Sequence, residues 1–152
     1  MADTKARIGY GSKVYLEASP FGAAVAPLVA AMVKVGEVVE LSPPNRTKNT
    51  VDATHMESEA AYMEFISALK DGGEVTVTYN RDPTDLGQVA ADAGFEYSGK
   101  VWLFIDLPFA TPLRWTIRGP ITGVEDEVPL DDKMQGSFTM KVSGKPTLAP
   151  VV

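Results

Sequence analysis

The sequence predicts a mainly β fold: a β-sandwich or closed barrel with one packed α-helix and a long loop. Residues 75–79, 113–117 and 138–142 alternate apolar and polar side chains, as half-buried strands do. Glycine, proline and aspartate separate these segments, and only residues 82–94 carry a strong set of helix signals. The 152-residue chain is 45% hydrophobic, which is enough for a single domain with its own core.

The composition excludes several functional classes. The 14 basic and 20 acidic residues give a formal net charge of −6, opposite in sign to a protein that grips nucleic-acid phosphates. The absence of cysteine excludes disulfides, a thiolate nucleophile and a cysteine zinc site, which fits a cytoplasmic protein. The uncharged stretch between Glu17 and Lys34 is short and contains two prolines, and the first residues lack the apolar run of a signal peptide. We therefore expect no membrane anchor.

The N-terminal part predicts two strands. Residues 1–12 are expected to form a flexible arm, and Lys13 to Ala18 alternates weakly as the first strand. Leu28 to Leu41 is rich in valine and predicts one long strand, in which Gly36-Glu37 marks a bulge or twist. Ser42-Pro43-Pro44 ends this strand.

A long polar segment follows. Residues 43–59 show no apolar period, which predicts a loop that is either a mobile surface segment or ordered against another molecule. Four apolar residues then recur at i, i+3, i+4 and i+7, which predicts a short helix after Ser58 whose apolar face is ordinary core. These residues are Tyr62, Phe65, Ile66 and Leu69.

The central part predicts a strand and a helix. Asp71-Gly72-Gly73 favours a tight turn into the strand at 74–80. Asp82 is the expected N-cap of the following helix, with Pro83 in its first turn and Gly94 at its end. We expect one face of this helix to be buried, formed by Leu86, Val89, Ala90 and Ala93.

The C-terminal part predicts further strands. Residues 101–107 are apolar on both faces, which indicates a strand that is buried on both faces, in the core or between subunits. A hairpin at 108–112 leads to the strand at 113–118. A weaker strand at 121–128 and a last one at 137–143 follow, and the short apolar tail 147–152 lies beyond Gly144-Lys145-Pro146.

No group of residues predicts catalysis, cofactor binding or metal binding. His55 is the single histidine and lies in the expected loop, so a triad would depend on it alone. The acidic run 125–132 lacks the ligand spacing of an EF-hand and reads as a solvated hairpin. Three glutamates fall in one segment, where nothing separates their pKa values for acid and base roles. They are Glu57, Glu59 and Glu64.

The order of several short motifs resembles the tail tube proteins of long-tailed bacteriophages. These motifs are Asp52-Ala53-Thr54, the aromatic-hydrophobic segment 62–69, Lys70 to Glu74 with its following strand, Asp82-Pro83 and the ending Ser143 to Pro146. The resemblance covers nearly the whole chain and also extends to the tubes of contractile tails and secretion systems. It suggests that part of 62–69 runs extended beside its neighbours.

This resemblance implies a structural protein and no enzyme. Such subunits form hexameric rings that stack into the hollow conduit of the tail, through which DNA passes without specific binding. The implied partners are further copies of the chain and the tape-measure, tail terminator and tail tip proteins. The implied location is the virion tail, with assembly in the host cytoplasm. Some relatives carry a C-terminal immunoglobulin-like domain, and this chain stops before one; both a phage and a domesticated tail-like particle fit.

The expected subunit-interface residues fall into two groups. The polar loop offers almost no apolar area to offset its ordering cost, so we expect it to order against neighbouring subunits. Its expected contact residues are Thr47, Lys48, Asn49, Val51, Asp52, Thr54 and Met56. Trp102 or Phe104 is expected where subunits meet, whereas Trp115 and Phe138 alternate with polar residues and are expected in the core.

The alternative is a monomeric β-sandwich that binds a ligand in the manner of a lectin. It would use the acidic hairpin together with the aromatic side chains of Tyr97 and Trp102 as a platform. A tube subunit should associate at high concentration, whereas such a module should stay monomeric.

Overall fold

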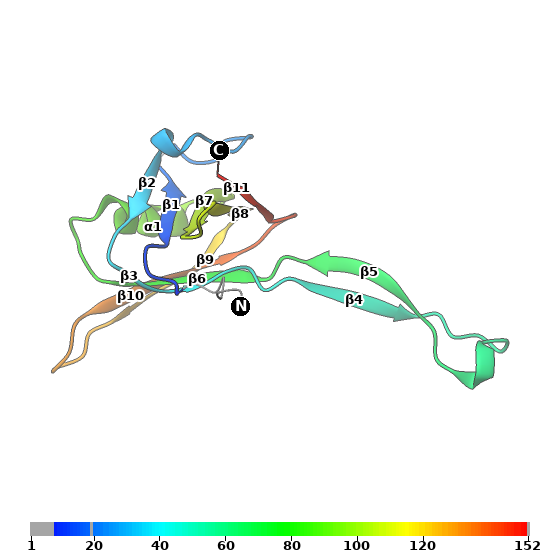
Figure 1. Cartoon of the computed structure of the whole chain (residues 1–152). Coiled ribbons are helices and arrows are strands. Elements are labelled where there is room, and N and C mark those ends of the chain that lie inside the picture. Colours follow the sequence, from blue (N-terminus) through cyan, green and yellow to red (C-terminus); the bar gives the residue numbers. More distant parts are fainter. Residues whose placement is uncertain (1–7, 19, 152) are drawn as a thin grey trace, which may run out of the picture.

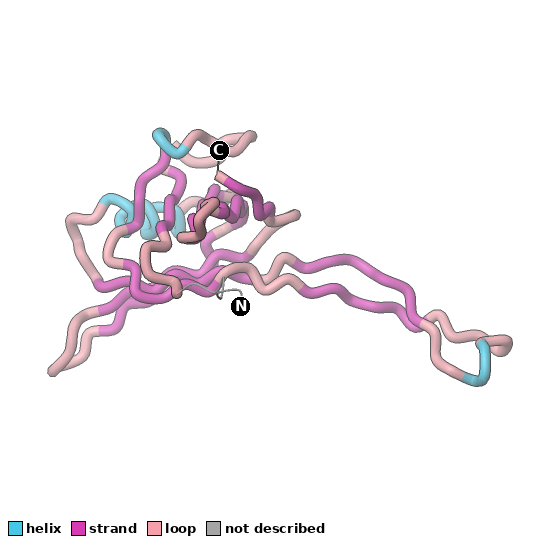
Figure 2. Tube along the Cα trace, in the orientation of Figure 1, coloured by secondary structure: helices cyan, strands magenta, loops and turns pink. Residues whose placement is uncertain are grey.

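The computed structural model describes residues 8–18 and 20–151. Two antiparallel sheets pack face to face, one helix packs beside them, and a two-stranded arm extends far beyond the sheets (Figures 1 and 2). The predicted mainly β fold is confirmed. The sequence also predicts a flexible N-terminal segment at residues 1–12, of which the first seven lie outside the described residues. Residues 8–12 form an exposed turn in which the Ser12 backbone N–H donates to the Gly9 carbonyl.

The first sheet has five strands in the order β11-β8-β7-β1-β2. They are β1 (Lys13–Glu17), β2 (Met32–Val35), β7 (Val101–Leu107), β8 (Leu113–Gly119) and β11 (Thr147–Pro150). The segment expected to be a plain tail, 147–152, thus contains an edge strand. Its backbone pairs with β8, where Leu148 lies opposite Trp115.

The second sheet has four strands in the order β3-β6-β10-β9. They are β3 (Val38–Ser42), β6 (Glu74–Asn80), β9 (Ile121–Glu127) and β10 (Gln135–Lys141). Val75, Val77 and Tyr79 of β6 are fully buried, which confirms the predicted inward face of this strand.

The long strand predicted for 28–41 is wrong. A short 3-10 helix (Val29–Ala31) comes first, and the chain then breaks at Gly36-Glu37 and continues in the other sheet. Glu37 has a φ of 59°, which a continuous strand does not contain. The Gly36 backbone N–H donates to an Asp85 carboxylate oxygen at 3.1 Å, and this bond holds the crossing point.

The core lies between the inner faces of the two sheets. Its largest fully buried side chains include Tyr79, Phe138, Leu16, Leu103 and Ile105. Trp115 is 7% exposed and Phe138 is fully buried, so their predicted core positions are confirmed.

The predicted helix is present as α1 (Leu86–Glu96), but its start and buried face differ from the prediction. Asp85 is the N-cap, because its carboxylate accepts from the Gln88 backbone N–H at 3.0 Å. Asp82 instead closes the preceding turn by accepting from the Thr84 backbone N–H. Gly94, expected to end the helix, lies inside it and is buried.

The buried face of α1 consists of small residues. Gly87 lies against the backbone of Lys34 and Val35, so any larger side chain there would hold the helix away from β2. Ala90, Ala91 and Gly94 are buried on the same side, and Gln88 satisfies its amide with backbone groups of Asn80 and Asp82. The large side chains of Leu86 and Val89 are 70% and 50% exposed, so predicting them as core was wrong.

The arm replaces both the long loop and the helix that the sequence predicts for residues 43–69. It consists of β4 (Thr47–Asp52), β5 (Phe65–Asp71) and a short 3-10 helix (Glu59–Ala61) near its tip. The predicted helix at 62–69 is wrong because the β5 backbone pairs with β4, and a helix would leave β4 without a partner. Within the described residues, no helix is long and apolar enough to cross a membrane.

Candidate functional site

The arm continues two strands of the second sheet. Along the chain, β3 leads into β4 and β5 leads into β6. Because β3 pairs with β6 and β4 pairs with β5, both antiparallel, residues 38–80 form one long hairpin that is interrupted at 43–46 and 72–73 (Figure 1). Gly73 has a φ of 77° at this interruption, and its Cα faces the Asn45 carbonyl so closely that a side chain has no room. Glycine therefore allows the two chain segments to approach each other closely at the root of the arm.

The root is fastened to β10. Asp71 accepts from the Gly73 backbone N–H at 2.9 Å and from the Lys141 ammonium at 3.1 Å. The Val142 backbone N–H donates to the Gly73 carbonyl. The Gly73 N–H, followed by the Lys141 hydrogen bond and charge, holds the pKa of Asp71 below its usual value.

The Asp52-Ala53-Thr54 motif closes the outer end of the strand pair. The Asp52 carboxylate accepts from the Thr54 backbone N–H at 2.9 Å, and the Thr54 hydroxyl accepts from the Glu64 backbone N–H at 2.8 Å. Hydrogen bonds from the Thr54 side chain and backbone lower the pKa of Asp52. The motif therefore shapes the turn and has no chemical role that the structure reveals.

The single histidine also belongs to the tip. His55 Nε2 lies 3.1 Å from a Glu64 carboxylate oxygen, and the Ser58 hydroxyl donates to the same oxygen at 2.6 Å. These groups are exposed and hold the tip turn together. Nothing in their geometry activates a nucleophile.

The arm exposes apolar side chains along its length. Val51 lies directly opposite Ile66 on the two strands, and both are more than half exposed. Monomeric proteins rarely leave so much apolar surface on one element, which points to a contact with another molecule. The exposed apolar residues of the arm are Val51, Met56, Tyr62, Met63, Phe65, Ile66 and Leu69.

The structure places the two groups of predicted interface residues on different elements. The first group lies on the arm: Thr47, Lys48, Asn49, Val51 and Asp52 on β4, with Thr54 and Met56 in the tip. Trp102 and Phe104 lie on the outer face of the first sheet, on β7.

Both β7 aromatics make contacts within the subunit. The Trp102 indole N–H donates to the Ala23 carbonyl at 2.8 Å, and the Arg118 guanidinium lies over its ring. Phe104 is 4% exposed beneath Arg114, so it offers little area to a partner.

The platform required by the ligand-binding alternative is not assembled. Trp102 is covered as described, and Tyr97 packs its ring against Phe21 with the ring centroids 5.4 Å apart. The acidic residues 125–132 lie on β9 and in the turn that follows it, at one end of the second sheet (Figure 1).

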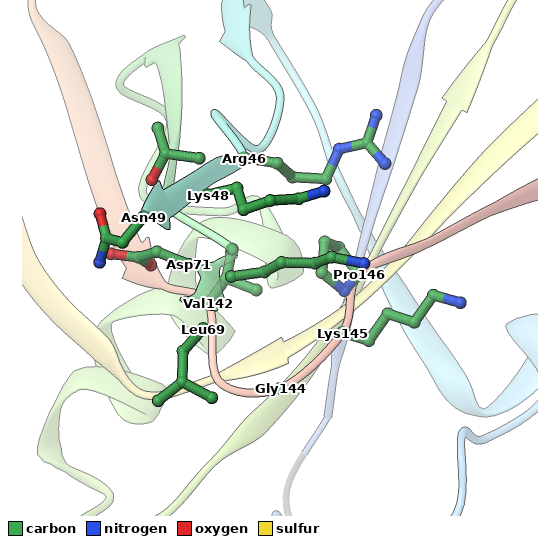
Figure 3. Close-up of a pocket in the computed structure, with 12 residues that line it drawn as sticks. Arg46, Lys48, Asn49, Leu69, Asp71, Val142, Gly144, Lys145 and Pro146 are labelled. Carbon is green, nitrogen blue, oxygen red and sulfur yellow. The ribbon is translucent and has the colours of Figure 1, made fainter. Parts of the chain in front are cut away.

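A groove at the root of the arm was missed by sequence reasoning. It has a volume of about 920 Å³ and lies between the start of the arm and the turn that leads to β11 (Figure 3). Its charged lining residues are mostly basic: Arg46, Lys48, Lys70 and Lys145, with Asp71 as the acidic one. The Arg46 guanidinium lies over the Trp115 ring, 5.0 Å from its centroid. In the sequence these cations fall in three separate segments and look like ordinary solvated residues. The pairing of β4 with β5 brings Lys48 and Lys70 together, and the turn before β11 adds Lys145.

The outer face of the second sheet carries hydroxyl, amide and charged side chains. Thr139 lies opposite Thr76, with their hydroxyl oxygens 3.5 Å apart. Ser137 lies between Thr78 and Glu125, and Thr78 lies opposite Glu40 on β3. This face therefore offers a wide polar surface without an apolar patch.

The comparisons with known proteins agree with one another. A family model described as lambda phage tail tube protein matches residues 14–149. No curated protein matches the sequence. The chain is similar to one in the tail of an empty GTA particle refined with C6 symmetry, at 14% identity and a TM-score of 0.68, covering 95% of this chain and 99% of that one.

Two other solved structures have the same fold. One is from the virion of a native gene transfer agent particle, at 12% identity and a TM-score of 0.71, covering 95% of this chain and 99% of that one. The other is the SPP1 tail tube, at 11% identity and a TM-score of 0.66, covering 95% of this chain and 80% of that one.

Proposed function

This chain belongs to the lambda phage tail tube protein family, and we propose that its copies form hexameric rings that stack into a hollow conduit for DNA. Its role as a structural tail tube subunit follows from the family. The observation that carries the finer proposal is the arm, because its exposed apolar side chains have no partner surface in their own subunit. The C6 symmetry of the similar GTA tail supports a ring of six.

The arm is the proposed contact between neighbouring copies. Val51 and Ile66 would bury their side chains on an adjacent subunit, and Thr47 to Thr54 would add hydrogen bonds. Trp102 and Phe104 are proposed to lie near a second contact between subunits, although their own rings are largely occupied within the fold. Ring closure would use the edges of the second sheet, β3 and β9, whose outer sides pair with no described strand.

The polar face of the second sheet is the proposed inner wall. Glu40, Glu74 and Glu125 lie on this face among hydroxyl groups, with Lys141 opposite Glu74, and the whole chain carries a net charge of −6. DNA has a negative charge about every 1.7 Å along its axis, so an acidic wall would repel the duplex. This arrangement would let DNA pass without specific binding.

The remaining partners are proposed from the family resemblance. They are the tape-measure, tail terminator and tail tip proteins. The proposed location is the virion tail, after assembly in the host cytoplasm.

Light scattering and negative-stain microscopy of the concentrated chain test the proposal. We expect scattering to rise with concentration and hollow filaments to be visible. A chain that stays monomeric at millimolar concentration, alone and with a tail tip extract as initiator, would contradict it.

A further inference from the structure

Two oppositely charged surfaces lie at opposite ends of the second sheet. Lys141 lies opposite Glu74 at the end where the arm and its groove begin. Gln135 lies opposite both Asn80 and Glu127 at the other end, beyond which residues 128–134 connect β9 to β10. The arm and the β9–β10 hairpin accordingly leave the sheet in opposite directions (Figure 1).

The groove holds cations without counter-ions. Among the residues that the structure describes, none of its four basic side chains forms an ion pair. Lys48 and Lys70 lie directly opposite each other on β4 and β5, an arrangement that destabilises an isolated hairpin. In Figure 3 the side chains of Arg46, Lys48 and Lys145 extend toward the same side. Such a set of charges favours an anionic partner.

The tip of the β9–β10 hairpin has the complementary properties. The exposed carboxylates at this end of the hairpin are Glu127, Asp131 and Asp132, with Lys133 as the one cation of the turn. Asp126 is not counted, because it lies 3.7 Å from Arg81. Leu130 is 98% exposed and Val128 is 72% exposed, so the tip also carries apolar surface.

The groove can receive that apolar surface too. Leu69 lines it and is 85% exposed, whereas Val142 and Pro146 line it with largely buried side chains. Apolar contact surrounded by opposite charges is the usual composition of a specific protein interface.

We propose that the acidic tip of the β9–β10 hairpin of one copy docks in the basic groove at the arm root of a second copy, and that this contact joins successive rings. The inference rests on the proposed function and names the surfaces that stacking uses. Repeated head-to-tail contact between two different surfaces produces an open filament wherever the rotation between copies does not close into a ring. The direction of the second sheet thereby becomes the direction of the tube.

Charge reversal tests the contact. A groove variant, Lys48→Glu with Lys145→Glu, and a tip variant, Asp131→Lys with Asp132→Lys, should each raise the concentration needed for elongation about tenfold or more, since each opposes like charges. An equimolar mixture should elongate again, because the acidic groove of one variant accepts the basic tip of the other. Lys100→Glu and Glu96→Lys are matched controls on exposed residues elsewhere and should elongate normally.

Cysteine cross-linking gives a second readout that does not depend on charge. The chain contains no cysteine, so a variant with Leu130→Cys and Lys145→Cys has only the two introduced thiols. Mild oxidation should yield a ladder of covalent oligomers, whereas Leu130→Cys with Lys100→Cys should not.

The outcomes separate this inference from the proposed function. The contact is overturned, and the tube function stands, if the wild-type chain forms tubes, the charge-reversal variants elongate normally and the cysteine variant gives no ladder. A wild-type chain that gives neither tubes nor a ladder overturns both.

Discussion

Asp71 couples the turn at the arm root to β10. Its pKa lies below the ordinary value of 3.8 because the carboxylate accepts from Gly73 and pairs with Lys141. A folded-state pKa that is depressed stabilises the folded root above pH 3.8, and this contribution disappears as the pH falls through the folded pKa. We expect the carboxyl of Asp71 to titrate below 3.8 in an NMR pH series, and Asp71→Asn to remove the acid-induced change at the root. A titration at or above the ordinary value would show that neither bond forms in solution.

The two tryptophans should differ in their effect on stability. Trp115 is 7% exposed in the core, so Trp115→Ala should lower the free energy of unfolding by roughly 3–5 kcal/mol. Trp102→Ala removes a half-buried ring and one hydrogen bond to Ala23, and we expect a clearly smaller loss of stability together with weaker assembly. Denaturant melts of both monomers measure the difference. Equal losses would contradict the assignment of Trp115 to the core and Trp102 to the outer face.

Strands with a strict period of two could be predicted residue by residue. In β6 and β10 every second side chain enters the core, so the pattern and the packing agree. The same reasoning failed for α1, where close backbone approach at Gly87 selects small residues for the buried face. Only the packing of the helix against β2 reveals that requirement.

The arm could not be predicted from its own residues because its apolar side chains do not pack within the subunit. Phe65, Ile66 and Leu69 match the spacing of an amphipathic helix, a pattern that predicts an apolar face buried in the core of the same subunit. The structure instead exposes them on β5. A segment whose partner belongs to another molecule defeats a pattern that infers burial within one chain.

The arm as an element should be dispensable for folding and required for assembly. Replacing residues 49–69 by Asn-Gly keeps Lys48 and Lys70 opposed across a two-residue turn. All residues removed are exposed except Ser58 and Ala68, which are partly buried, so we expect the thermal melt of the monomer to be nearly unchanged, whereas elongation should be lost. Circular dichroism and negative-stain microscopy provide the two readouts. Met56→Ser, which changes only one exposed side chain, is the control that should retain the arm. If the shortened chain forms tubes of normal length, the prediction that the arm is required for assembly is wrong.

The β4 strand of the arm should be protected from amide hydrogen exchange only after assembly. Every residue of β4 is exposed in the subunit, so little buried area offsets a backbone ordering cost of about 1–2 kcal/mol per residue. We expect the amides of residues 47–56 to exchange rapidly in the monomer and to become protected in tubes. The amides of β6, buried in the second sheet, are the internal reference and should be protected in both states. Strong protection of β4 in the monomer would show that the arm needs no neighbour to order.

At the scale of the whole molecule, the sandwich, the arm and the charged hairpin are all consistent with the one direction of growth that we propose. In the proposed tube, the edges of the second sheet would close the ring and its polar face would line the channel. The arm and the β9–β10 tip extend beyond opposite ends of the strands of this sheet. The order of motifs in the sequence was enough to suggest the family, because the turns and strands occur at family-like positions. It did not reveal the groove, which depends on residues 46–48, 69–72 and 142–146 meeting in space.

The most direct test of the central claim is a cryo-electron microscopy reconstruction of filaments grown from the purified chain. We predict a hollow tube of sixfold rings in which Glu40, Glu74 and Glu125 on the second sheet face an acidic lumen and the arm crosses to a neighbouring copy. A tube with a basic lumen, or one in which the arm points into solvent, would contradict the account.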